Sequence, residues 1–160
     1  MRAFLAAAAA LLFFRACADE DVFSAEDVLP FDRFCASAGG VLFLPQGGAG
    51  AGRLGGVAVR AGWYATEFTA FEAAAMRLEN RFGASAGVLW HWWGYERFDP
   101  FFVYGASWAA GVGAGPSAGA GFYWHIDERW SFRLDAAHSL LVDGGVAGAF
   151  TFSCMIRATW

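Results

Sequence analysis

The sequence contains no lysine, and charged residues make up only 16% of its 160 residues. An average globular chain is about a quarter charged, so a soluble enzyme of this size would carry more surface charge. The formal net charge of −4, with no cluster of basic residues, argues against nucleic-acid binding. Without lysine, a P-loop and Schiff-base chemistry are both excluded.

Apolar residues, in contrast, are abundant: 58% of the chain is hydrophobic, 18% is aromatic, and there are 21 glycines. Disordered chains have low hydrophobicity, so this composition excludes disorder. The length allows one domain of ordinary size. The composition therefore favours a folded protein whose outer surface does not face water.

Residues 1–18 have the layout of a secretory signal peptide. Met1-Arg2 gives a positive start, residues 3–14 are uniformly apolar, and Ala16-Cys17-Ala18 is a small-x-small cleavage site. The apolar run is too short for a membrane-spanning helix. We expect cleavage between Ala18 and Asp19, which makes the mature chain an exported protein.

The mature chain divides by charge into two parts. Residues 19–32 hold six acidic residues and no basic one, whereas residues 33–160 hold nine arginines and nine acidic residues. We interpret 19–32 as a solvated N-terminal extension without a function of its own. Residues 33–160 are the expected structured domain.

Several stretches of that domain alternate with a period of two, which is typical of β-strands with two different faces. Between 57 and 64, Val57, Val59 and Trp63 share one face, while Arg60 lies on the other. The same alternation occurs in residues 117–126, 130–137 and 150–160. All four prolines fall outside these stretches, as strand pairing favours.

Short polar turns begin at residues 65, 96 and 127, which are 31 residues apart, and they predict four consecutive hairpins. The expected turns are 65–67, 96–99 and 127–129, and the expected connections at the opposite end are 46–55, 79–84, 111–116 and 142–145. Eight strands of about ten residues match tilted membrane-spanning strands. Lipid admits only helices or closed barrels. The sequence therefore predicts an all-β fold, an eight-stranded antiparallel up-and-down transmembrane β-barrel in the bacterial outer membrane.

Five segments carry a resemblance to a known family: Arg97-Phe98-Asp99-Pro100-Phe101, 111–116, 119–123, 127–135 and the terminal Trp160. Through them the chain resembles, over about residues 33–160, the small outer-membrane β-barrel family typified by the OmpA transmembrane domain and OmpX. In that family the last residue is usually aromatic, most often Phe, and the last strand is read by the barrel-assembly machinery. Phe150, Phe152, Ile156 and Trp160 are similar to that signal. The resemblance implies this machinery and outer-membrane lipid, including lipopolysaccharide, as partners.

An eight-stranded barrel is narrow enough for its own side chains to fill. We expect opposite charges to pair inside it, because an unpaired charge in a dry lumen is costly, and we expect no open pore. A gated ion path is the alternative. The predicted inward polar residues are Arg60, Glu72, His91, Tyr123, His125, Arg133, Asp135 and Arg157. The predicted outward aromatic girdles, at the level of the lipid headgroups, contain Trp63, Trp92, Trp124, Trp130 and Trp160.

Three motifs suggest other functions. Residues 50–55 match G-x-G-x-x-G, but the strand predicted at 57–64 leaves no helix N-terminus for a phosphate. The run Trp90-His91-Trp92-Trp93 is explained by the girdle, with stacking on sugar as the alternative. His138-Ser139 suggests a lipid A deacylase, yet adjacent strand residues point to opposite faces and Leu140 stands where the deacylase motif has Asn.

Neither a metal site nor a soluble cofactor is predicted, because the mature chain keeps only Cys35, Cys154 and three scattered histidines. The strand phasing places Cys35 inward and Cys154 outward, which makes a disulfide between them a minority hypothesis. Two rival folds are a transmembrane helix over 101–126, which six glycines and Pro116 disfavour, and a secreted β-sandwich. The predicted function is a non-enzymatic role in envelope integrity or surface interaction. Lipid A modification and a narrow channel are the alternatives.

Overall fold

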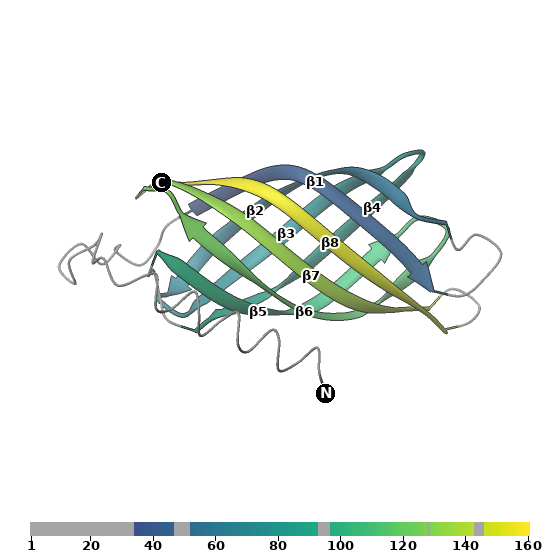
Figure 1. Cartoon of the computed structure of the whole chain (residues 1–160). Helices are drawn as coiled ribbons and strands as arrows, with labels where there is room; N and C mark the ends of the chain where they lie inside the picture. The colour runs from purple at the N-terminus through teal and green to yellow at the C-terminus, as the bar shows by residue number, and fades with distance from the viewer. Residues whose placement is uncertain (1–33, 47–51, 93–96, 128, 143–145) are drawn as a thin grey trace, which may run out of the picture.

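The computed structural model describes residues 34–46, 52–92, 97–127, 129–142 and 146–160, which form one closed β-barrel (Figure 1). Each strand pairs antiparallel with the next, and β8 pairs with β1. This confirms the eight-stranded up-and-down barrel. The strands are β1 Phe34–Gln46, β2 Leu54–Thr66, β3 Thr69–Leu78, β4 Arg81–His91, β5 Phe98–Ala109, β6 Gly113–His125, β7 Trp130–Val142 and β8 Val146–Thr159.

The predicted cleavage site at Ala16, Ala18 and Asp19 and the acidic extension 19–32 lie outside the described residues. Within the described part of the chain, no helix is long and apolar enough to cross a membrane.

The seam between the first and last strands closes the barrel. Its register runs from Cys35 opposite Thr159 to Gln46 opposite Gly148. Beyond β8, Phe34 N donates to Trp160 O at 3.1 Å and Trp160 N donates to Phe34 O at 3.0 Å. Both edges of the sheet are therefore paired along their length, as a hydrocarbon environment requires.

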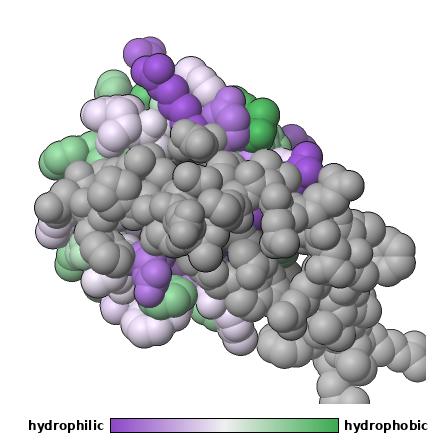
Figure 2. Space-filling model, turned by 90° about the vertical axis from the view of Figure 1, so that its left-hand side faces the viewer, coloured by the Kyte–Doolittle hydropathy of each residue, from purple (hydrophilic) through white to green (hydrophobic). Residues whose placement is uncertain are grey.

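The seam also defines the two ends of the barrel. The start of β1 and the end of β8 lie at what we call the terminus end, together with the connections 67–68, 92–97 and 126–129. The opposite loop end carries the connections 47–53, 79–80, 110–112 and 143–145. Figure 2 views the molecule from the terminus end, where strongly hydrophilic side chains stand at the edge among pale and hydrophobic ones.

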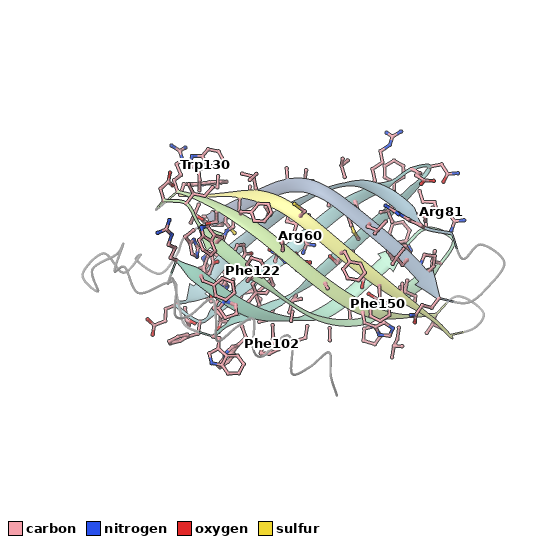
Figure 3. All side chains as sticks on the ribbon, in the orientation of Figure 1. Arg60, Arg81, Phe102, Phe122, Trp130 and Phe150 are labelled. Carbon is pink, nitrogen blue, oxygen red and sulfur yellow. The ribbon has the colours of Figure 1, made fainter. Side chains whose placement is uncertain are left out.

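The two faces of each strand differ as the alternation predicts. In β2, Val57 and Val59 are about 60% exposed on the outer face. Ala58, which lies between them, and Tyr64, further along the same strand, are buried toward the lumen. Apolar residues that lie outward in this way remain stable only if lipid covers them. Figure 3 shows the same arrangement, with Phe102 and Phe150 outside and Arg60 within the barrel.

Several predicted connections are too long. The turn expected at 96–99 is wrong at its end, because β5 begins at Phe98 and Asp99 is a fully buried strand residue. The connection expected at 79–84 is only 79–80, because β4 begins at Arg81. Likewise, β6 begins at Gly113 rather than after 116. Mixed small and apolar residues hide the ends of these strands from a period-two pattern.

The prolines also differ from expectation, since Pro45, Pro100 and Pro116 all lie inside strands. Pro116 is tolerated where the β6–β7 ladder is interrupted: paired residues pass from Ala114–Val142 to Ser117–Ser139 with no pairs between. A proline has no N–H to give to a ladder. Because the ladder is interrupted here, no backbone N–H is needed from residue 116.

Close approach of neighbouring strands explains some of the inward glycines. A Cβ on Gly39, which faces the lumen in β1, would lie 2.1 Å from the backbone oxygen of Cys154 in β8. A Cβ on the adjacent outward Gly40 would meet nothing within 4 Å. The close approach of β1 and β8 in this narrow barrel thus excludes even a methyl group at position 39.

We expect Gly39→Ala to lower the free energy of unfolding by about 1–3 kcal/mol, because the added methyl group must displace β8. The matched Gly40→Ala change should stay within about 0.5 kcal/mol of wild type. Urea unfolding in detergent micelles, followed by tryptophan fluorescence, measures both. Equal effects of the two substitutions would contradict the close approach of β1 and β8.

Candidate functional site in the barrel lumen

Four charged side chains form a closed ring across the middle of the lumen. Arg60 of β2 contacts Glu72 of β3 at 2.8 Å and Asp135 of β7 at 3.3 Å. Arg133 of β7 completes the ring through Glu72 and, at 2.6 Å, through Asp135. These four side chains are at most 8% exposed. The ring therefore links opposite walls of the barrel through buried, charge-assisted hydrogen bonds.

Two hydroxyl groups extend this ring. Ser153 of β8 donates to Asp135 at 2.6 Å and accepts from Arg60 at 3.2 Å. Arg133 also donates to the hydroxyl of Tyr123 at 2.8 Å. Such additional partners are needed because ion pairs in a low-dielectric interior must satisfy their remaining donors and acceptors.

Aromatic rings surround the arginines on the terminus side of the ring. The Arg157 guanidinium carbon lies 4.7 Å from the ring centroid of Tyr64 and 4.4 Å from that of Tyr123. Arg133 lies 4.7 Å from the Phe101 centroid. Cation–π contacts of this kind are strongest when desolvated. They hold two buried guanidinium groups at the centre of a packed cluster.

A second polar cluster lies nearer the terminus end. His91 Nδ1 is 2.6 Å from Asp99 Oδ2, and the Ser131 hydroxyl is 2.7 Å from His125 Nδ1. His125 Nε2 is 3.8 Å from the same Asp99 oxygen. Tyr123 joins both clusters, because its ring stacks on His91 at 5.7 Å.

Serine, histidine and aspartate are the residue types of a nucleophilic triad, but the geometry here is that of an internal network. Ser131 is 2% exposed and Asp99 is fully buried. The close partner of Asp99 is His91, whereas a triad needs the carboxylate to orient the histidine that contacts the serine. A substrate would also have to displace packed aromatic rings to reach the hydroxyl.

The loop end of the lumen is apolar. Leu78 and Leu141 have no exposed surface, and Phe43 is 2% exposed. They pack with a cluster of other inward side chains: Val41, Ala58, Met76, Ala109, Ala149 and Met155. Apolar packing thus occupies the loop end, and polar networks fill the middle and the terminus end.

Charge within the described lumen is balanced. Three arginines, Arg60, Arg133 and Arg157, face it together with three carboxylates, Glu72, Asp99 and Asp135. Among the described residues, no group of three or more His, Cys, Asp and Glu side chains is arranged to hold a metal ion. The balanced charges of this arrangement stabilise one another.

The structure places all eight predicted inward polar residues on the lumen side, and it brings them together in the two clusters just described. Three members of the clusters were not predicted: Asp99, Ser131 and Ser153. Asp99 was assigned to a turn, although extending the alternation of Phe102 and Tyr104 back along β5 would have placed it inward. The two serines lie on faces that were predicted to point inward, but they are small and uncharged, so the sequence did not single them out.

The predicted girdle residues lie on the outer face, and all of them lie at the terminus end. Trp63 stacks on Phe71 at 5.8 Å, and Trp92 packs against Phe102 at 5.7 Å. Trp130, labelled in Figure 3, and Trp160 are exposed. Trp124 is half-buried beside Phe98. At the loop end, the tryptophan on the outer face among the described residues is Trp108.

The other motifs separate in the structure. His138 packs on Phe150 at 4.6 Å on the outer face, whereas Ser139 is buried and hydrogen bonded to Ser107 at 2.7 Å. Trp90 points outward and His91 inward, and Trp93 lies outside the described residues. The G-x-G-x-x-G segment leads into β2, a strand.

The two cysteines among the described residues, Cys35 and Cys154, are free thiols on opposite faces. Cys35 is buried and pairs in register with Thr159, whereas Cys154 is exposed and pairs with Gly40. A disulfide requires Cα atoms within about 7 Å and side chains on one face. The register excludes this bond in the folded barrel.

No protein-family model and no curated protein matches this chain. Solved structures do. The outer membrane protein OprG from Pseudomonas aeruginosa matches with a TM-score of 0.64 at 8% identity, over 81% of this chain and 96% of its own. The N-terminal β-barrel domain of Pseudomonas aeruginosa OprF matches with a TM-score of 0.62 at 10% sequence identity, over 81% of this chain and 98% of its own. Ail, the attachment invasion locus protein of Yersinia pestis, matches with a TM-score of 0.60 at 10% sequence identity, over 82% of this chain and 100% of its own. The chain therefore has the fold of small eight-stranded outer-membrane barrels.

The charge ring yields a stability prediction. We expect Arg133→Met to lower the free energy of unfolding by about 3–5 kcal/mol, because it leaves Glu72 and Asp135 buried with less compensation. The exposed Arg97→Met change should cost less than about 1 kcal/mol. Adding Glu72→Gln to Arg133→Met should recover part of the loss. Urea unfolding of the four proteins measures this, and equal losses for Arg133→Met and Arg97→Met would contradict the role of the ring.

Proposed function

We propose that this chain is an integral outer-membrane β-barrel protein with a side-chain-filled lumen, and that it contributes to the integrity of the bacterial envelope. The observation that carries the proposal is the closed ladder, with an apolar outer face and a lumen packed with the protein's own side chains. A closed sheet with lipid-compatible residues outside suits a bilayer. A packed interior suits a passive, structural role.

Several features support an outer-membrane location. The strands contain 10 to 14 residues, enough to span the bilayer when tilted. Large apolar side chains are exposed on seven of the eight strands, all except β6. Residues 1–18 look like an export signal, and OprG, a structure with the same fold, is described as an outer membrane protein. The exposed Phe150, Phe152, Ile156 and Trp160 suit recognition of the last strand by the barrel-assembly machinery.

The connections support a structural role more than an adhesive one. At the loop end they include the two-residue 79–80 and the three-residue 110–112. Large ligand-binding loops are the usual means by which a rigid scaffold recognises a partner. Surface interaction through the rims remains part of the proposal, on a correspondingly small area.

The proposal includes no catalytic role. The deacylase alternative requires His138 and Ser139 to act together, and their side chains lie on opposite faces of β7. A hydrolase needs its base within hydrogen-bond reach of the nucleophile. The channel alternative requires a continuous aqueous path, and the buried Phe43, Leu78 and Leu141 argue against one.

We expect the full-length protein to fractionate with the outer membrane and to migrate differently on SDS gels before and after boiling. A closed ladder offers detergent no free edge, so the barrel should stay folded until it is heated. Immunoblots of membrane fractions, with and without boiling, measure location and folding together. An unshifted band in the soluble periplasmic fraction would contradict the proposal.

We also expect planar bilayers that contain the purified protein to show no single-channel steps, because packed side chains fill the lumen. The variant Leu78→Ala/Leu141→Ala, which removes apolar volume at the loop end, is the comparison for sensitivity. Discrete steps from the heat-modifiable wild-type protein would favour the narrow channel over the structural role.

A further inference from the structure

Four polar side chains near the terminus end come from the ends of four consecutive strands. His91 is the last residue of β4 and His125 the last residue of β6, whereas Asp99 and Ser131 are the second residues of β5 and β7. All four are buried. Their contacts therefore tie these strand ends together beside the connections that join β4 to β5 and β6 to β7.

The Asp99 carboxylate has fewer cationic partners than the other carboxylates of the lumen. Glu72 and Asp135 each contact two arginines in the ring. Asp99, within the described part of the chain, forms ion pairs with histidines alone: its Oδ2 lies 2.6 Å from His91 Nδ1 and 3.8 Å from His125 Nε2. Its Oδ1 has no hydrogen-bond partner among the described residues. A histidine balances a carboxylate only when it is protonated. Because an unbalanced buried charge is costly, the cluster favours the uptake of one proton.

The hydrogen bond between Ser131 and His125 provides a place for that proton. The Ser131 hydroxyl is 2.7 Å from His125 Nδ1, and a hydroxyl can donate or accept. When His125 is neutral, the hydroxyl donates to Nδ1 and the Nε2–H faces Asp99. When Nδ1 takes up a proton, the hydroxyl turns to accept it, and the Nε2–H still faces Asp99. The proton is thus bound while the heavy atoms keep their places.

His91 offers no such place. Its Nδ1 is directed at Asp99, so a further proton would have to bind to Nε2. His91 Nε2 is buried and has no hydrogen-bond partner in the described part of the chain. A buried donor without a partner is unfavourable, so the added proton belongs on His125.

Nearby cations limit the uptake to one proton. His91 stacks on Tyr123 and packs against Tyr64 at 5.2 Å. The guanidinium carbons of Arg157 and Arg133 lie 4.4 Å and 5.3 Å from the centroid of the same Tyr123 ring. Their positive charges disfavour a second charged imidazole close by.

The other ionisable groups around the cluster have different surroundings. Cys35 of β1 packs in the apolar cluster with Tyr64, and Glu72 of β3 contacts Arg60 and Arg133. On the rim, the Arg97 guanidinium carbon lies 5.6 Å from the ring centroid of Trp124. Asp127 accepts hydrogen bonds from the backbone N–H groups of Arg129 and Trp130. The two histidines are therefore the groups, among those described, that can balance Asp99.

We infer that Asp99, His91 and His125 form a binding site for one proton, which enters at His125 Nδ1 and stabilises the barrel in mildly acidic surroundings. In an unfolded chain, histidine changes its charge near about pH 6.5. Only the folded barrel places Asp99 beside it, so the folded state binds the proton more tightly. The free energy of unfolding therefore rises as the pH falls from about 8 toward about 6.5, below which the unfolded chain is protonated too. This inference goes beyond the proposed function, because it concerns the folded barrel whatever its role in the envelope.

Urea unfolding of the full-length, heat-modifiable protein in detergent micelles tests the site. For wild type we expect an equilibrium constant of unfolding at least about fivefold smaller at about pH 6 than at about pH 8. In Asp99→Asn and in His125→Gln, this difference should shrink to about twofold or less. The matched control is His138→Gln, which removes the histidine that packs on Phe150 at the outer face and should keep the wild-type difference.

Nuclear magnetic resonance of the wild-type protein with labelled histidines gives a test that needs no variant to fold. The chain has three histidines. At about pH 7, where a free histidine is mostly neutral, we expect the His125 ring to be predominantly protonated on both nitrogens.

Three results would overturn the inference. Three neutral rings at that pH would show that no proton is bound. Protonation of His91 or His138 in place of His125 would put the proton elsewhere. An equal pH dependence of unfolding in wild type and His125→Gln would show that the cluster does not couple acidity to stability.

Discussion

Pairing of every backbone amide and carbonyl group is the constraint on which the rest of this structure depends. A sheet in hydrocarbon cannot leave an edge open, because each unpaired polar group costs several kcal/mol. The β1–β8 seam meets this constraint and extends to the bonds between Phe34 and Trp160. Once eight strands close, the radius is fixed, and the size of the lumen follows from it.

A lumen of that size must be filled by side chains, and the filling is layered. Apolar residues such as Leu78 and Leu141 occupy the loop end, whereas ion pairs and aromatic rings occupy the middle. Buried charges are tolerated only when they are paired and hydrogen bonded. The ring of Arg60, Glu72, Arg133 and Asp135 satisfies this by joining strands that are far apart in sequence, and so specifies how the walls face each other.

The outer surface differs from the lumen in the kinds of side chain that it carries. It is apolar along the strands and aromatic near the terminus end. The packed lumen therefore contributes stability, whereas the apolar outer face suits a lipid environment.

Much of the fold could be predicted, because period-two alternation and the 31-residue spacing of turns are direct consequences of strands with two environments. The faces of Val57, Arg60 and Arg133 followed from that alternation. The ends of β4, β5 and β6 did not, because alanine, glycine and uniformly aromatic stretches look alike on both faces.

The contacts between side chains within the lumen were harder to predict from the sequence than the face on which each side chain lies. The alternation placed Asp135 and Arg60 inward but not in contact across the barrel, since register between distant strands depends on closure. Asp99 was missed because its position next to Pro100 resembles a turn.

Closure of the β1–β8 seam can be measured directly by nuclear magnetic resonance of the isotope-labelled protein in detergent micelles. We expect cross-strand contacts between backbone protons of Val41 and Ser153, and of Gly39 and Met155, together with slow amide exchange in both strands. Contacts between β1 and β2 without any between β1 and β8, with fast amide exchange along β1 and β8, would show an open sheet and contradict closure of the barrel.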